Sequence, residues 1–94
     1  MTESIISNDK RCYVCGKMKD LHRHHCFYGT GNREMSEKYG LWVYLCPEHH
    51  NVSNYGVHFN KPFDTMLKRY CQMIWERQRG TREQFREIFG KSYL

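Results

Sequence analysis

Two short stretches decide how this chain folds: Leu21-His22-Arg23-His24-His25 and Cys46-Pro47-Glu48-His49-His50. Four of the six histidines occur in them as two adjacent pairs. Cys12 and Cys15 precede the first stretch with a Cys-x-x-Cys spacing, and His58 follows the second. Cysteine and histidine side chains at such short spacings are typical ligands of zinc and related metal ions. The sequence therefore predicts a protein built around metal sites.

The composition indicates one small domain outside the membrane. A chain of 94 residues buries a limited share of its surface, so a bound metal ion would add stability that its core lacks. The mean hydropathy is −0.84, and no apolar run approaches the roughly 20 residues needed to span a bilayer. Residues 1–11 have neither a basic start nor an apolar core, so we expect no signal peptide and a cytoplasmic location.

The first candidate site combines two short pairs of ligands, Cys12-x2-Cys15 and Cys46-x2-His49. Each pair lies on a predicted turn, and together they supply the four ligands of a closed, tetrahedral structural zinc site. His50 is adjacent to His49, and the spacing favours His49 as the fourth ligand. Unrelated thiols are the alternative explanation.

The other two cysteines, Cys26 and Cys71, lack such neighbours. In a reducing cytosol we expect them to be buried thiols and not partners in a disulfide.

The local pattern predicts an α+β domain. Residues 21–28 suit a short strand, and residues 41–45 are the best strand because they are rich in aromatic and β-branched side chains. Residues 29–33 are expected to form a turn, and residues 36–40 a helical turn or loop. Pro47 then opens a helix that is expected to extend to about Tyr55 and to end at Gly56.

Two helices are predicted in the last third of the chain. Asn60 caps the first, with Pro62 in its first turn, and Gly80 ends it. Residues 81–84 form a capping box that begins the second helix, which ends at Gly90. The aromatic side chains of both helices are expected in the core. We divide the chain into a flexible lead (1–9), a metal-containing core (10–60) and C-terminal helices packed on that core (61–94).

A second candidate site arises if His49 belongs to the zinc site. His50 then points elsewhere, and His24, His25 and His58 are also available, as is Asn54 one helical turn after His50. Such ligands suit Mn²⁺, Ni²⁺ or Zn²⁺, whereas Mg²⁺ prefers oxygen ligands. Adjacent residues of a strand point to opposite sides, so one of His24 and His25 can bind an ion while the other acts as a base. The alternatives are a second structural metal or surface histidines.

The order of these features resembles the HNH nuclease family, in particular its small, zinc-knuckled phage and prophage members with a ββα-metal core. The resemblance covers about residues 12–58. It is carried by His24-His25, Gly29-Thr30-Gly31, Cys46-Pro47-Glu48-His49-His50 and Val57-His58. Two positions depart from the family pattern: Tyr39-Gly40 replaces the middle Asn, and His49 replaces the fourth Cys of the knuckle.

The resemblance implies a role for each histidine. His25 matches the general base, with its other ring nitrogen held by a backbone carbonyl. His24 and His50 match ligands of a catalytic divalent ion (Mg²⁺, Mn²⁺, Ni²⁺ or Zn²⁺). His58 is expected to complete that ligand set, with Asn54 as its competitor. The implied reaction is hydrolysis of a DNA phosphodiester bond in a bacterial cytoplasm, encoded by a phage or another mobile element.

The formal net charge of +5 agrees with a polyanionic partner, and a solvated basic helix face is the alternative. Basic residues expected to hold the DNA backbone are Arg33, Lys68, Arg69, Arg77 and Arg79. Two other functions remain open: a catalytically weak HNH-type module that binds nucleic acid or a protein, and a purely structural zinc module. A homodimer would suit cleavage of both strands.

Overall fold

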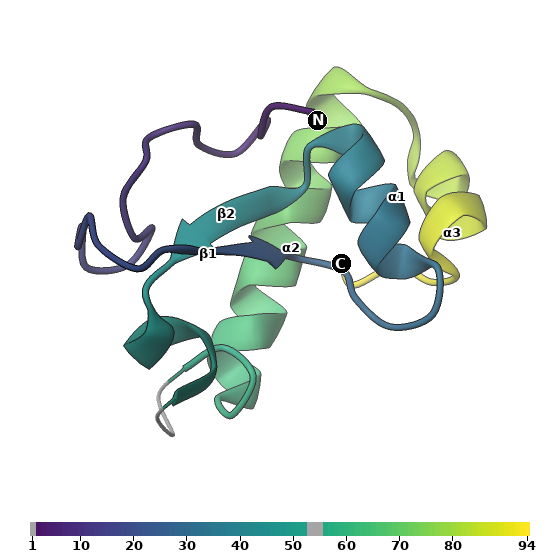
Figure 1. Cartoon of the computed structure of the whole chain (residues 1–94). Helices are drawn as coiled ribbons and strands as arrows, with labels where there is room; N and C mark the ends of the chain where they lie inside the picture. Colours follow the sequence, from purple (N-terminus) through teal and green to yellow (C-terminus); the bar gives the residue numbers. More distant parts are fainter. Residues whose placement is uncertain (1, 53–55) are drawn as a thin grey trace.

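A computed structural model describes residues 2–52 and 56–94 of the chain (Figure 1). Within these ranges the elements are, in order, β1 (His22–His25), α1 (Asn32–Tyr39), β2 (Trp42–Leu45), a turn of π-helix η1 (Glu48–Val52), α2 (Lys61–Gln78) and α3 (Arg82–Phe89). The predicted α+β class is confirmed. Among the described helices, none is long and apolar enough to cross a membrane.

The two strands form an antiparallel sheet, and its two faces carry different side chains. His22 lies opposite Leu45 and His24 opposite Val43, so these four side chains share one face. Arg23 and His25 lie on the other face, opposite Tyr44 and Trp42 respectively. The adjacent residues His24 and His25 therefore point to opposite sides of β1, as strand alternation predicts.

The strands are connected through α1, which is longer than the helical turn or loop expected over residues 36–40. It begins after Gly31 and ends at Gly40, and both glycines have positive φ angles, of 83° and 72°. No side chain caps its first turn, so a usual signal for a helix start is missing from the sequence. The buried Ser36 hydroxyl donates to the Phe27 carbonyl and accepts from the Phe27 N–H, which fixes α1 to the end of β1.

The segment expected to be a flexible lead is hydrogen-bonded to β2 and its preceding turn. The buried Ser4 hydroxyl donates to the Trp42 carbonyl at 2.6 Å, and the Trp42 indole donates to the Thr2 carbonyl at 2.9 Å. The Ile5 N–H donates to the Gly40 carbonyl at 2.9 Å, and a Cβ atom at Gly40 would collide with the Glu3 carbonyl. Residues 2–5 thus cover the end of the sheet at which Trp42 pairs with His25.

The helices α2 and α3 contribute five buried side chains to the core. The Asn60 side chain accepts from the Phe63 N–H at the start of α2, and the predicted capping box joins Thr81 to Gln84 at the start of α3. α2 crosses the direction of the two strands, and α1 and α3 pack side by side (Figure 1). Buried side chains that join these layers are Phe27, Leu67, Cys71, Trp75, Phe85 and Phe89. The expected position of the helical aromatics in the core is confirmed for Trp75, Phe85 and Phe89, whereas Tyr70 is 44% exposed.

The buried thiols of Cys26 and Cys71 meet in this core, with their Sγ atoms 2.9 Å apart. Cys26 follows β1 and Cys71 belongs to α2, so the pair lies where the sheet packs on the helix. The expectation that both cysteines are buried is confirmed.

Candidate metal sites

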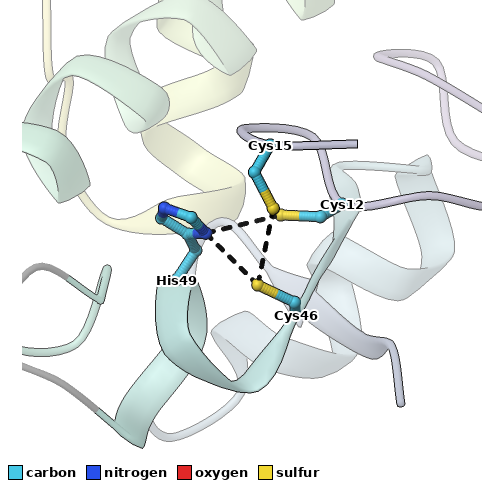
Figure 2. Close-up of side chains that lie close together, drawn as sticks. All are labelled: Cys12, Cys15, Cys46 and His49. Atoms are coloured by element: carbon cyan, nitrogen blue, oxygen red, sulfur yellow. Dashed lines mark hydrogen bonds between the residues drawn. The ribbon is translucent and has the colours of Figure 1, made fainter. Parts of the chain in front are cut away.

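Among the described residues, two groups of side chains can hold a metal ion, and the first consists of Cys12, Cys15, Cys46 and His49. Cys12 and Cys15 lie on the turn before β1, Cys46 follows β2 and His49 belongs to η1. Figure 2 shows the three sulfur atoms and the imidazole converging on one point.

The distances in this group are close to those of a tetrahedral zinc site. The Cys15 and Cys46 Sγ atoms are 3.8 Å apart. The His49 Nδ1 atom is 3.2 Å from Cys46 Sγ and 3.8 Å from Cys12 Sγ. Zinc–sulfur bonds of about 2.3 Å and zinc–nitrogen bonds of about 2.0–2.1 Å put two sulfurs about 3.8 Å apart, and a sulfur and a nitrogen about 3.6 Å apart. The four side chains therefore fit zinc in both chemistry and spacing.

The backbone hydrogen bonds around the first group hold its ligands in position. The Cys12 N–H donates to the Lys17 carbonyl at 2.7 Å, and the Gly16 N–H donates to the Cys12 carbonyl at 2.9 Å. Gly16 has a φ angle of 79°, a conformation that glycine adopts without strain. The Tyr13 N–H donates to the Tyr44 carbonyl, which attaches the turn to β2.

The thiols of this group differ in acidity. Burial opposes ionisation of Cys12, but backbone N–H groups, including those of Cys15 and Cys46, outweigh it and lower its pKa to about 6. Cys12 is therefore mostly a thiolate at neutral pH, the form that binds zinc. Burial and the neighbouring thiols raise the pKa of Cys46, so an ion has to displace its proton.

The second group consists of His24, His50 and His58, with one ring nitrogen of each within 4.8 Å of the others. The Nε2 atoms of His50 and His58 are 3.1 Å apart, close to the roughly 3.3 Å between two nitrogens on a tetrahedral zinc ion. His24 is 2% exposed, and its buried Nε2 atom has no hydrogen-bond partner among the described residues. An unpaired buried nitrogen is costly unless it binds a ligand.

Two of these imidazoles stay neutral well below physiological pH. Burial, followed by the nearby His50 and His58, lowers the pKa of His24 to about 3. Burial, followed by His58 and His22, lowers the pKa of His50 to about 4. A neutral imidazole binds a metal ion without first losing a proton. The lone pairs of His24 and His50 are therefore available at pH 7.

The turn η1 separates the adjacent pair, with His49 in the first group and His50 in the second. Of the helix expected over residues 47–55, the described part contains the π-helical turn Glu48–Val52, and residues 53–55 lie outside the described residues. The Val57 and His58 N–H groups donate to the His49 and His50 carbonyls at 2.8 and 3.1 Å, and so bring His58 beside His50. Asn54, the expected competitor of His58, lies outside the described residues.

His25 lies outside both groups and contacts a carboxylate. Its Nε2 atom is 2.8 Å from Glu37 Oε1, so a side chain of α1 holds this nitrogen and the expected backbone carbonyl does not. Arg23 donates to both carboxylate oxygens of Glu37, at 2.9 and 2.7 Å. The sequence interpretation missed Glu37 because only the helical conformation of α1 turns it toward β1.

A shallow hollow beside His25 is lined by Arg33, Glu34, Met35, Glu37 and Lys38. The charge of Arg33 also contributes to the lowered pKa of His50, after burial and the neighbouring histidines. Arg33 thus links the surroundings of His25 with those of the second metal group. Lys68 acts on the same group, because its charge contributes to the lowered pKa of His24 after burial and the neighbouring histidines.

The other expected DNA contacts lie on α2 or at its C-terminal end. Lys68 is paired with Asp64 at 2.9 Å and lies 4.3 Å from the centre of the Tyr28 ring. Arg69 lines a groove on α2. Arg77 and Arg79 lie at the opposite end of α2 from His58, about 24 Å or more along the helix axis.

His22 is a further residue of the second group's surroundings to which the sequence interpretation gave no role. Its Nδ1 atom is 2.9 Å from His50 Nδ1. The alternation of β1 was the available signal, because it puts His22 and His24 on the same face.

Comparison with known proteins adds no relative: no family model, curated protein or solved structure matches this chain. The class that the structure itself defines is a small α+β protein with Cys/His groups suited to metal ions such as zinc.

Proposed function

We propose that this protein is a metal-dependent DNA endonuclease of the HNH type, with one structural zinc ion and one catalytic divalent ion. The observation that carries the proposal is the second histidine group, in which three imidazoles converge and two of them stay neutral at pH 7. Structural zinc sites usually have four protein ligands, whereas catalytic sites keep a position open for water or substrate. Three ligands favour the catalytic kind.

The chemistry of the donors also limits the ion. Imidazole nitrogens suit Mn²⁺, Ni²⁺ or Zn²⁺, and Mg²⁺ would need oxygen ligands from phosphate or water. When bound, such an ion supplies Lewis-acid stabilisation of the charge that develops on the phosphate and on the leaving oxygen. His24, His50 and His58 would hold it.

The proposed general base is His25. Its Nε2 atom faces Glu37, which leaves Nδ1 to accept a proton from the attacking water. The carboxylate of Glu37 then stabilises the imidazolium that forms, and Arg23 holds the carboxylate in place. Arg33 would bind the phosphate, and two observations support this role: it lines the same hollow as His25, and its charge contributes to the lowered pKa of His50.

A second candidate function is binding without hydrolysis, and the exposed apolar surface of α2 favours it. Met66, Tyr70 and Met73 are 60%, 44% and 43% exposed and line one groove with Lys61 and Arg69. Such a surface suits a partner molecule more than water. Binding without hydrolysis is also favoured by the position of His25, which lies on the sheet face opposite to the proposed ion ligand His24.

Incubation of supercoiled plasmid with the purified protein separates the two functions. We compare the wild type, His25→Ala and a control variant, Glu87→Ala, which changes an exposed residue of α3. Each protein is tested with Mn²⁺, Ni²⁺, Zn²⁺, Mg²⁺ or EDTA. We expect nicked or linear DNA only with a divalent ion, a loss of about 10²–10⁴-fold in rate for His25→Ala, and no change for Glu87→Ala. Retained DNA binding with no cleavage in any ion would establish the binding module instead.

A further inference from the structure

His22 contacts His50 although it does not belong to the group of three histidines that could bind the ion. Its Nδ1 atom is 2.9 Å from the Nδ1 atom of His50, and the rings meet edge to face with centres 5.0 Å apart. His50 faces His58 through its other nitrogen, with the two Nε2 atoms 3.1 Å apart. His50 therefore lies between His22 and His58, and each of its ring nitrogens has a different neighbour.

The location of one proton decides what His50 can do. A hydrogen bond between two imidazole nitrogens needs a proton on one of them and a lone pair on the other. If the Nδ1 atom of His50 carries its proton, the Nε2 lone pair is free to bind an ion. If Nε2 carries the proton, His50 cannot bind an ion through that atom.

We propose that His22 is a positioning residue for the second metal site: its Nδ1 lone pair accepts the Nδ1 proton of His50. This acceptor fixes both the tautomer and the ring orientation of His50, so that Nε2 faces His58 with its lone pair. The inference rests on the proposed function, because it assumes that the histidine group binds an ion. It adds a fourth histidine that acts through His50 without touching the ion.

The geometry of β1 supports this assignment. His22 and His24 share one face of the strand, so one element supplies both a ligand and the partner of another ligand. A metal-bound histidine usually donates its other N–H to an acceptor that fixes the ring, and losing that acceptor typically weakens metal binding by about 10–100-fold. His50 is turned toward His22 in the way that such an acceptor requires.

The test uses three substitutions of His22 in the full-length protein. His22→Ala removes the acceptor. In His22→Asn the side-chain oxygen takes the approximate position of Nδ1 and so restores an acceptor. In His22→Gln, the matched control, the oxygen lies farther from the backbone, nearer the position of Nε2.

Titration with Co²⁺ reports the two metal groups separately. The Cys12 group gives sulfur-to-cobalt charge-transfer absorption, whereas the histidine group gives d–d bands without it. We expect His22→Ala and His22→Gln to weaken Co²⁺ binding at the histidine group by about 10–100-fold, and His22→Asn to bind almost as wild type does. The charge-transfer absorption should be unchanged in all three, which shows that the fold is intact.

Two results would overturn the positioning role alone: equal Co²⁺ affinity in wild type and His22→Ala, or an equal loss in His22→Asn and His22→Gln. The second result would mean that His22 acts by packing. If wild type binds no Co²⁺ at the histidine group, the proposed catalytic ion site fails, and the role of His22 fails with it.

Discussion

The side chain of Glu37 connects the candidate base His25 with the N-terminal segment at Thr2. It accepts from His25 and Arg23 and, at 3.3 Å, from the Thr2 N–H. Burial raises the pKa of Glu37, but these hydrogen bonds outweigh burial and lower the pKa to about 2. The carboxylate therefore stays ionised in the folded protein even in mild acid.

The pKa of Glu37 predicts how its contribution to stability changes with pH. Its folded value of about 2 lies below its ordinary value of 4.5, so the contribution is complete above pH 4.5 and is lost as the pH falls toward 2. We expect Glu37→Gln to lower the free energy of unfolding by about 1–2 kcal/mol at neutral pH, with a difference from wild type that shrinks below pH 4.5.

Urea unfolding of both proteins across this pH range measures that difference, with the exposed Glu87→Gln as the control. A difference that is constant with pH would show that the charge of Glu37 does not matter to the fold. The loss of stability from protonation of His24 affects wild type and variant alike and so cancels.

At the scale of elements, η1 is where the two metal groups meet. It follows β2 directly, with Cys46 before it and His49 and His50 within it. The Cys12–Cys15 turn lies at the same end of the sheet as η1, because the first residue of β1 pairs with the last residue of β2. An ion in the first group would therefore close a long loop. A zinc ion so bound contributes about 10–16 kcal/mol, as large as the entire stability of a typical domain.

Loss of the first ligand should therefore unfold the protein. We expect Cys12→Ser, or wild type treated with a chelator, to lose its cooperative melting transition and to release about one zinc ion per chain. Cys71→Ala is the control, because this buried thiol belongs to neither metal group and its loss should leave the zinc bound. A chelated protein that melts like the untreated one would contradict the structural zinc site.

Local signals account for the elements that could be predicted. Thr81 and Gln84 carry a complete capping box, and Asn60 with Pro62 marks the start of α2, so both helices begin as expected. α1 was underestimated because its ends depend on two glycine conformations and on Ser36, which bonds to Phe27. These contacts form only once the strand is in place, and a local pattern does not contain them.

At the scale of the whole molecule, the basic residues do not form one surface. The charges of Arg33 and Lys68 reach the histidine group, whereas Arg77 and Arg79 lie at the far end of α2. The net charge of +5 thus favours general attraction to a polyanion over one continuous track for it. Sequence composition reports the charge, but only tertiary packing decides where it lies.

The sequence predicted the first metal group more completely than the second, because the second depends on tertiary packing. The first follows from two short spacings that end on turns, Cys12-x2-Cys15 and Cys46-x2-His49. The second needs β1, η1 and residues 57–58 to meet, and spacing alone did not choose between His24 and His25. Resemblance to a known family supplied that assignment, while His22 and Glu37 emerged only from tertiary contacts.

We propose that the adjacent histidines His49 and His50 of η1 bind two separate ions. Native mass spectrometry of the protein saturated with Zn²⁺ counts the bound ions directly, for wild type and for His24→Ala. We expect two ions per folded wild-type chain and one per His24→Ala chain, with the cysteine-bound ion retained. A single ion in saturated wild type, unchanged by His24→Ala, would contradict this proposal.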